Sequence, residues 1–226
     1  MENLSWRSVD VSLERPIDYQ ELNGVYAKFG KRLFDIVFAL LLFPVVLPVT
    51  GLLWALIKCD GGPGFFGHVR IGQNGKAFKC WKIRSMVVDA EKKLKAYLEQ
   101  NPDAAAEWAK DFKLEKDPRI TQLGRFLRKS SLDELPQIWN VLKGEMSFVG
   151  PRPIIEAELV KYGGYQWAYL AATPGVTGVW QVSGRNDVSY DERVRMDAEY
   201  LEKRSFLFDC AIMLKTVSAV LNRTGK

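Results

Sequence analysis

Residues 36–57 form an uninterrupted stretch of 22 uncharged, mostly apolar residues, and no other feature constrains the fold as strongly. A straight helix needs roughly 20 residues at 1.5 Å each to cross the hydrocarbon core of a bilayer, so the stretch is long enough. It begins well inside the chain and no small-residue cleavage site follows it, unlike a secretory signal peptide. A buried core helix is the alternative, but helices that are apolar on all sides are rare in small domains. We therefore expect a membrane helix.

Two prolines, Pro44 and Pro48, lie near the middle of this segment, where each removes a backbone donor and crowds the preceding turn. The flanking positive charges are Lys28, Lys31 and Arg32 before the segment and Lys58 and Arg70 after it. Because both flanks are positive, the positive-inside rule does not orient a single span, whereas a re-entrant hairpin keeps both flanks in the cytoplasm. Re-entrant and spanning helices both remain open, and the charge symmetry favours re-entry.

Asp35 lies at the rim of the apolar segment, one helical turn after Lys31. An acidic residue at that depth usually has a partner, and the i,i+4 spacing predicts an ion pair between these two side chains. An ordinary interfacial charge is the alternative.

The composition is that of a folded protein with a modest positive charge. The 226 residues are 47% hydrophobic and 26% charged, and the formal net charge is +5, which favours an anionic partner. The basic residues are dispersed among acidic ones and no nucleic-acid-binding motif occurs, so we expect no nucleic-acid partner. The one histidine, His68, excludes a multi-histidine metal site, and we expect it to be packed or solvated. Three cysteines without CxxC spacing argue against a zinc cluster or a disulfide framework.

The rest of the chain predicts an α+β fold that is mainly helical. Alternating apolar residues on either side of Asn74-Gly75 predict a small β-hairpin from 66–70 and 77–83. Residues 89–113 have helical spacing that is interrupted near Asn101-Pro102. A second apolar helix is expected over 205–222, where two internal charges indicate an interfacial or packing helix rather than a span.

Polar functional groups concentrate in residues 125–153, around the adjacent carboxylates Asp133 and Glu134. One interpretation is structural, because Ser131 and Glu134 have the S-x-x-E spacing of a helix capping box, although Pro136 fits that box poorly. The other is chemical. A carboxylate in the first turn of a helix stays ionised, can hold Mg²⁺ together with substrate phosphates, and can attack phosphorus. Nearby arginines would bind a diphosphate in bidentate fashion. The pattern alone favours capping and leaves both interpretations open.

Five sequence motifs occur in order along the chain. They are KRLFD (31–35), the proline-containing apolar segment, SSLDELPQIWNVLKGEMSFVGPRP (130–153), PGVTGVWQVSGRN (174–186) and FLFDCAIMLKT (206–216). Together they resemble the bacterial sugar transferase family, the monotopic polyprenol-phosphate phosphoglycosyl transferases that begin exopolysaccharide and O-antigen assembly. The resemblance extends from about Lys28 to the C-terminus, and the ordered set is far more specific than any single motif. The chain is similar to the small members that are essentially the catalytic domain.

The resemblance implies a reaction and the residues that perform it. Asp133 would attack the β-phosphate of a UDP-sugar, release UMP and form a sugar-phosphoryl carboxylate. Polyprenol (undecaprenyl) phosphate would then attack that intermediate in a ping-pong second step. Asp133 and Glu134 would be the catalytic pair and would hold the required Mg²⁺. The residues that match phosphate-surrounding positions of the family are Lys82, Arg84, Arg128, Arg152, Arg185 and Asn186.

The resemblance also implies a location. The family's re-entrant helix matches residues 31–57, including Lys31, Arg32 and Asp35, with the break at Leu47-Pro48. Small members often have Ser where this chain has Leu47, and Pro44 is an additional break, so which proline sets the bend stays open. We expect an N-terminal extension (1–29), a re-entrant membrane hairpin (30–58) and a catalytic domain with amphipathic interfacial helices (59–226). That domain would lie on the cytoplasmic face of the bacterial inner membrane.

The expected partners are a UDP-sugar, polyprenol phosphate and the lipid bilayer, with downstream glycosyltransferases as further candidates. The exopolysaccharide resemblance favours galactose or glucose as the sugar, and the protein would be a monomer or a homodimer. A membrane-anchored adaptor without catalysis is the competing function, in which Asp133 and Glu134 only cap a helix. Release of UMP from a UDP-sugar separates the two.

Overall fold

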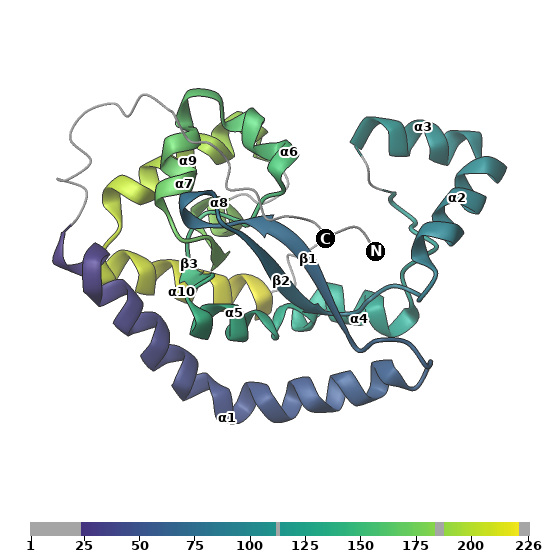
Figure 1. The fold of residues 1–226 in the computed structure, drawn as a ribbon, viewed down its shortest axis with the longest axis horizontal. Coiled ribbons are helices and arrows are strands. Elements are labelled where there is room, and N and C mark those ends of the chain that lie inside the picture. The colour runs from purple at the N-terminus through teal and green to yellow at the C-terminus, as the bar shows by residue number, and fades with distance from the viewer. Residues whose placement is uncertain (1–23, 112–113, 184–187, 222–226) are drawn as a thin grey trace.

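The computed structural model describes residues 24–111, 114–183 and 188–221, and this part of the chain is mainly helical with two small sheets (Figure 1). The predicted α+β class is therefore confirmed. The α-helices are α1 (Lys31–Lys58), α2 (Ala90–Gln100), α3 (Pro102–Asp111), α4 (Gln122–Ser130), α5 (Gln137–Lys143), α6 (Glu156–Leu159), α7 (Gln166–Ala171), α8 (Val179–Ser183), α9 (Tyr190–Lys203) and α10 (Phe206–Leu221). The strands are β1 (Phe65–Ile71), β2 (Ala77–Ile83), β3 (Ser147–Val149) and β4 (Gly175–Thr177). The short helical turns are η1 (Tyr26–Gly30), η2 (Gln73–Gly75), η3 (Leu132–Glu134) and η4 (Val160–Tyr165).

Helix α1 contains the apolar segment, and it is one continuous helix with Pro44 and Pro48 inside it. Figure 1 shows its axis changing direction partway along, with the rest of the protein on the concave side. Proline keeps a helical φ while it removes a donor and crowds the preceding turn, so the helix bends without unwinding. The predicted helix–break–helix is thus corrected to a bent helix. By length and composition the helical stretch Tyr26–Lys58 could cross a membrane, and little of it is buried within the protein.

Polar side chains at the start of α1 attach it to distant parts of the protein. The Lys31 ammonium donates to Oδ2 of Asp209 in α10 over 2.7 Å, and both side chains are buried. Oδ1 of Asp35 instead accepts from the Ser147 hydroxyl at 2.9 Å and from the backbone N–H of Phe148 at 3.0 Å. The predicted direct ion pair between Lys31 and Asp35 therefore does not form. Burial raises the pKa of Asp35, and the charge of Lys31 opposes that rise. The fully buried Asp209 carboxylate requires a cation nearby, and Asp35 is satisfied by neutral donors.

Arg32, the next residue of α1, holds the end of α5. Its guanidinium donates to the carbonyl oxygens of Val141 and Leu142 at 2.5 and 2.7 Å. Carbonyls in the last turn of a helix have no donor within that helix; Gly144 donates to the Val141 oxygen, and the arginine adds donors to this oxygen and to that of Leu142. The membrane helix is thereby coupled to the element that directly follows the Asp133-Glu134 segment.

Strands β1 and β2 form the predicted hairpin, and β1 extends one residue further at each end than expected. Phe65 pairs with Ile83 and Ile71 with Ala77. Asn74 has a φ of 57° in the connecting turn, a left-handed conformation that Asn tolerates better than most side chains. The short Asn-Gly signal therefore located this element correctly.

The parallel pair β3–β4 is a second sheet, which the sequence did not predict. Ser147 pairs with Gly175, and Val149 with Thr177. Just beyond this register the two backbones nearly touch, because a Cβ on Gly175 would lie 2.1 Å from the backbone nitrogen of Gly150. Only glycine fits there. The close approach brings the Pro-Arg-Pro segment after β3 next to helix α8, which follows β4.

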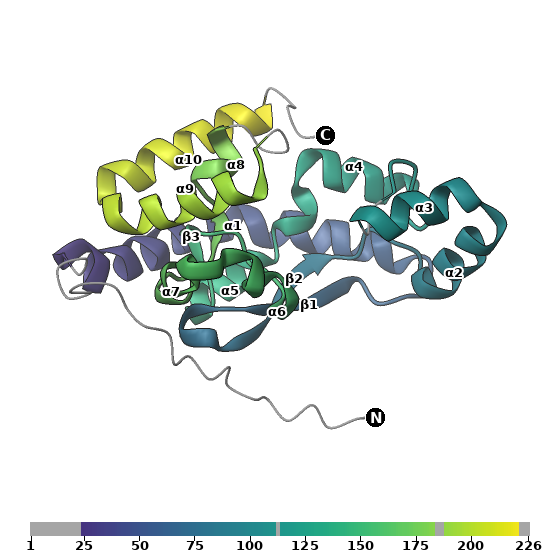
Figure 2. The same cartoon turned by 90° about the horizontal axis from the view of Figure 1, so that it is seen from above.

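Helices α2 and α3 are separated at Asn101, as predicted, and extend from one end of the molecule (Figure 1, Figure 2). Figure 2 shows α8, α9 and α10 together on the side of the molecule away from the hairpin. Helix α10 buries Asp209 completely, whereas Leu207 and Leu214 are 78% and 73% exposed. Its packing role is thus confirmed, and its apolar outer face is of the kind expected for an interfacial helix.

Candidate active site

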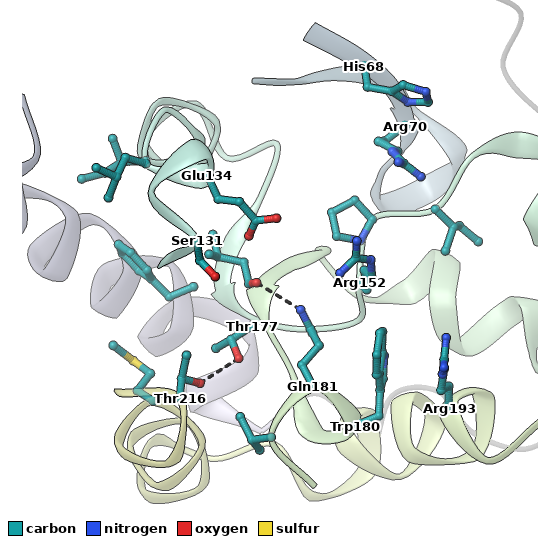
Figure 3. A pocket seen from close by; sticks show the side chains of 18 of the residues that line it. His68, Arg70, Ser131, Glu134, Arg152, Thr177, Trp180, Gln181, Arg193 and Thr216 are labelled. Atoms are coloured by element: carbon teal, nitrogen blue, oxygen red, sulfur yellow. Dashed lines mark hydrogen bonds between the residues drawn. The ribbon is translucent and has the colours of Figure 1, made fainter. Parts of the chain in front are cut away.

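A cavity of about 1070 Å³ lies between α1, the hairpin, η3 and helices α8–α10 (Figure 3). Its apolar wall consists of Phe38, Leu42 and Val46 of α1 together with Ile138, Phe148, Met213 and Val217. Its charged wall consists of Arg70, Arg128, Glu134, Arg152, Glu158, Lys161 and Arg193. Figure 3 shows Arg70, Arg152 and Arg193 grouped on one side, with Glu134 facing them from the other. The cavity thus combines a membrane-helix wall with a predominantly cationic one.

Asp133 and Glu134 lie in the single 3₁₀ turn η3, between α4 and α5. Ser131 ends α4 in a left-handed conformation with a φ of 57°, and its side chain makes no capping hydrogen bond. The capping-box interpretation is therefore wrong, because Ser131 stands between α4 and η3 and its side chain does not cap the Asp133-Glu134 turn. A non-glycine residue in this conformation costs energy, which fits a segment whose geometry serves a site.

Lys82 of β2 contacts both carboxylates. Its ammonium lies 2.6 Å from Oε1 of Glu134 and 3.8 Å from Oδ2 of Asp133. Burial raises the pKa of Asp133, which is 7% exposed, and Lys82 opposes that rise. Burial alone would also raise the pKa of Glu134, but Lys82 and then Arg152 outweigh it and hold that pKa below its usual value. Glu134 lines the cavity, and Asp133 lies behind it against Lys82.

Arg128 and Arg152, two of the predicted phosphate-binding residues, line the cavity. The Arg128 Nε donates to the Ser85 hydroxyl at 2.8 Å, which fixes the side chain across the gap between α4 and β2. The Arg152 guanidinium lies 5.9 Å from the centre of the Trp180 ring, a favourable cation–π arrangement. The structure therefore brings these arginines to the same cavity as Glu134.

Arg84 does not line the cavity, although its sequence position matched a phosphate-binding one. It is 7% exposed and donates to the Asp60 carboxylate at 2.5 Å. It also donates to the carbonyl oxygens of Ile57, Pro63 and Met86 at 3.2, 2.6 and 2.8 Å. This geometry assigns Arg84 to holding the exit of α1 against the hairpin, which corrects the expectation. Arg185 and Asn186 lie outside the described residues.

Five further residues line the cavity that the sequence did not single out: Arg70, Lys161, Trp180, Tyr190 and Arg193. The Arg193 guanidinium lies 4.7 Å from the centre of the Trp180 ring, and the Lys161 ammonium 5.2 Å from that of Tyr190. Arg70 is 3.5 Å from the Glu158 carboxylate. These residues come from β1, η4, α8 and α9, so only the tertiary fold unites them. The alternation of side chains along β1 was the one sequence signal that could have placed Arg70 on the cavity-facing side of the strand.

His68 lines the same cavity, where packing or solvation had been expected. Burial, and then Arg70, lower its pKa, so the ring is neutral at pH 7. Its Nδ1 lies 3.0 Å from the carbonyl oxygen of Val69. His68 therefore contributes a neutral polar group to the wall.

No group of three or more His, Cys, Asp or Glu side chains in the described part of the chain could hold a metal ion by itself. Asp133 and Glu134 nevertheless fit Mg²⁺, which retains waters and is held by one or two carboxylates with substrate phosphates. Both carboxylates already lie within 4 Å of the Lys82 ammonium, so positive charge is stabilised at this position. The donor set therefore suits Mg²⁺ in the presence of a diphosphate.

The fold combines a helix long and apolar enough to cross a membrane with a cavity lined mainly by cationic charged groups, and comparison with known proteins names its family. The family model described as bacterial sugar transferase matches residues 26–223, and the chain belongs to that family. The chain is similar to the exopolysaccharide production protein ExoY of Rhizobium meliloti, with 45% identity over 97% of this chain and 99% of that protein.

Two longer relatives are also similar to this chain. A UDP-galactose-lipid carrier transferase of Erwinia amylovora is 53% identical over 88% of this chain and 42% of its own length. An undecaprenyl-phosphate galactose phosphotransferase of Salmonella typhimurium is 52% identical over the same shares. The chain thus spans less than half the length of these two proteins. The family assignment from the five motifs is confirmed.

Proposed function

We propose that this protein transfers a sugar-1-phosphate, galactose- or glucose-1-phosphate, from a UDP-sugar to undecaprenyl phosphate and releases UMP. The supporting observation is the cavity, which is lined both by apolar residues of α1 and by Glu134 with several arginines. A lipid chain and a diphosphate are the two ligands that such a wall suits. The relatives from Erwinia amylovora and Salmonella typhimurium are named for substrates of this kind.

The proposed first step is attack by an Asp133 carboxylate oxygen on the β-phosphorus of the UDP-sugar. The bond from that phosphorus to the bridging oxygen breaks, and UMP leaves with the bridging oxygen and its electron pair. The aspartyl sugar-phosphate that remains is then attacked by a phosphate oxygen of undecaprenyl phosphate. The aspartyl oxygen–phosphorus bond breaks, which regenerates the carboxylate and yields the undecaprenyl diphosphosugar. Both nucleophiles are anions, so neither step needs a proton donor.

The described side chains have separate roles in this scheme. Lys82 keeps Asp133 closer to its ionised form, because it opposes the effect of burial. Arg128 and Arg152 would bind and orient the diphosphate. Asp133 and Glu134 are the residues that would hold Mg²⁺, which when bound neutralises charge on the phosphates.

The proposed location is the cytoplasmic face of the inner membrane, with α1 re-entrant. The bend in α1 and the pairing of Lys31 with Asp209 support it, because the start of α1 is attached to the same domain that follows its end. A spanning α1 would have to place these two regions on opposite sides of the bilayer. The reaction would then take place at the membrane surface, where undecaprenyl phosphate resides.

The decisive test compares Asp133→Asn with wild type, with UDP-galactose, UDP-glucose and UDP-N-acetylglucosamine as donors and UMP as the readout. Asp133→Asn should abolish turnover, because an amide does not attack phosphorus. Glu134→Gln should impair turnover and leave the attachment site intact. Asp103→Asn, at an exposed position of α3, is the matched control and should behave as wild type. Wild type incubated with UDP-sugar and Mg²⁺ alone should gain the mass of a sugar-phosphate on the peptide that contains Asp133.

A folded Asp133→Asn protein with near-normal UMP release would end the nucleophile assignment. Absence of UMP release by wild type with every donor would instead favour the membrane-anchored adaptor.

A further inference from the structure

A second cavity of about 390 Å³ lies beside the bend of α1, outside the site described above. Phe43, Leu47 and Thr50 of α1 form one side of it, and Trp81 and Trp139 form the other. Its volume is within the range of small-ligand pockets, and its wall is almost entirely apolar. Such a wall suits a hydrocarbon and offers little to a polar ligand.

The two cavities meet at shared side chains. Val46 and Ile138 line both of them, so the second cavity adjoins the one that contains Glu134 at these two side chains. Val46 is on α1 and Ile138 on α5, which directly follows the Asp133-Glu134 turn. A chain with its polar end near Glu134 can therefore continue past these two residues without leaving apolar surroundings.

The second cavity also opens on the surface that a bilayer would cover. Leu47 is 57% exposed and Trp139 is 51% exposed, although both side chains are apolar and line it. The one charged residue in the wall, Lys143, lies 6.0 Å from the Trp139 ring at this rim. A tryptophan and a snorkelling lysine are typical of the membrane–water interface.

Thr50 adds a polar feature to the wall. Its side chain is 8% exposed, and its hydroxyl has no hydrogen-bond partner among the described residues. The π electrons of a carbon–carbon double bond can accept a weak hydrogen bond from a hydroxyl group, which a saturated chain cannot do. The wall is therefore better matched to an unsaturated hydrocarbon than to a saturated one.

We propose that the second cavity binds the isoprenoid chain of the lipid acceptor, while the acceptor's phosphate lies near Glu134 in the first cavity. The inference rests on the proposed function, and it adds the path of the chain and the residues that select for chain length. The continuity through Val46 and Ile138 favours this occupant over a phospholipid acyl chain. In the second cavity a phospholipid would find only Lys143 to bind its headgroup phosphate. Its binding would also leave unexplained why this cavity adjoins the one that contains Glu134.

The test measures kcat/KM for undecaprenyl phosphate and for a two-isoprene phosphate, such as geranyl phosphate, with UMP release as the readout. Leu47→Trp fills the second cavity from an exposed position and should lower the ratio of the long-chain to the short-chain value about 10-fold. Val45→Trp is the matched control, because Val45 is 66% exposed on the same helix and lines neither cavity. It should retain the wild-type ratio. Thr50→Val should lower the ratio by a smaller factor, with an unchanged melting temperature.

A Leu47→Trp ratio equal to that of wild type overturns the proposal. So does a phospholipid retained by purified wild type in native mass spectrometry and lost from Leu47→Trp, if the ratio is unchanged. Failure of the proposed function is distinct, since wild type would then release no UMP with either acceptor.

Discussion

Arg84 and Arg152 are two arginines near the site whose surroundings differ. A guanidinium has five N–H donors, and Arg84 directs its donors to one carboxylate and three carbonyl oxygens. Arg152 faces the cavity and contacts Trp180 through its charge. The first arginine therefore stabilises the fold, and the second is positioned to bind a ligand.

Arg84→Lys should lower the free energy of unfolding by about 2–4 kcal/mol, because a lysine cannot bond three separate carbonyl oxygens and the Asp60 carboxylate at once. The KM for UDP-sugar of the folded variant should stay near the wild-type value. Arg152→Gln should do the reverse, with a KM raised at least about 10-fold and an unchanged melting temperature. Thermal unfolding and UMP-release kinetics measure both quantities. An Arg84→Lys protein with a raised KM and normal stability would return Arg84 to the binding site.

At the residue scale, the sequence identified the groups that are adjacent in the chain. Asp133, Glu134 and Arg128 lie within seven positions of the chain, so a local pattern was enough to find them; Glu134 and Arg128 line the cavity, and Asp133 lies against Lys82. Arg70 and Arg193 reach the same cavity from β1 and α9, which no short-range spacing relates. The αL conformation of Ser131 was hidden for another reason: the S-x-x-E pattern is the same whether the serine ends a helix or begins one.

At the element scale, one buried contact joins η4 to α9. The Tyr162 hydroxyl donates to Oδ2 of Asp197 at 2.8 Å, and both side chains are buried. Burial raises the pKa of Asp197 from its usual 3.8 to about 7, and the hydrogen bond from Tyr162 opposes this only in part. The folded protein therefore holds this carboxyl protonated at a pH where the unfolded chain releases the proton.

The contribution of Asp197 to stability should fall as the pH rises from about 4 to about 7 and then level off, because unfolding releases a proton in that window. Asp197→Asn keeps an acceptor for Tyr162 and should remove this part of the slope. It should also stabilise the protein at pH 8 by roughly 3–4 kcal/mol. Chemical denaturation between pH 5 and 8 measures the slope. Glu199→Gln, an exposed carboxylate of the same helix, is the control, and an Asp197→Asn slope equal to that of the control contradicts the assignment.

Replacing Pro44 and Pro48 together by Ala should straighten α1. Without the prolines, residues 36–57 would form a helix roughly 33 Å long, which is close to the hydrocarbon thickness, so part of the population should span the membrane. The two single substitutions show which proline sets the bend. Accessibility of Cys59 to a membrane-impermeant maleimide reports the change, with Pro63→Ala as the control outside the helix. Unchanged labelling of the double variant would show that the polar contacts of Lys31 and Arg32 suffice to hold the geometry.

Elements defined by local signals were predictable, and those defined by distant contacts were not. The hairpin has Asn74-Gly75, and α2 and α3 have Pro102 at their junction, so the sequence located both. The strands β3 and β4 have three residues each and are 25 residues apart, and their pairing depends on the close approach of Gly150 and Gly175. Such short strands carry no readable alternation. Helix α1 bends without a break because each proline removes only one backbone hydrogen bond, while the turns before and after it keep theirs.

At the scale of the whole molecule, α1 lies along one edge and the remaining elements lie on the concave side of its bend (Figure 1). The polar contacts at its start and the Arg84 contacts at its end both attach to that same side. Apolar residues on its outer surface, such as Leu41 and Leu52, remain exposed. The molecule therefore has one face suited to lipid, with the charged part of the cavity directed away from α1.

Residue 10 and Cys59 should face the same side of the membrane, because the proposed topology places both flanks of α1 in the cytoplasm. A cysteine at position 10, and the exposed native Cys59 in a separate protein, should react with an impermeant maleimide in inverted vesicles. Neither should react in right-side-out vesicles. Cys80 and Cys210 are replaced by Ser in both proteins, and Cys59 also in the protein with a cysteine at position 10, so that each carries a single thiol. Labelling of the two positions from opposite sides would mean that α1 spans the bilayer.

The contact between Lys31 and Asp209 joins residues 178 positions apart, and this separation sets an order of events during synthesis. At 5–20 residues per second, roughly 8 to 30 seconds pass between the synthesis of the end of α1 and that of Asp209. In the proposed topology, the nascent helix therefore enters the lipid while the charge of Lys31 is balanced only by water and lipid headgroups. The contact between Lys31 and Asp209 forms only after most of the catalytic domain has been translated. A chain truncated before α10 would lack Asp209, so the start of α1 would not be attached to the rest of the protein. We expect quality-control proteases to recognise such a chain by its unattached helix.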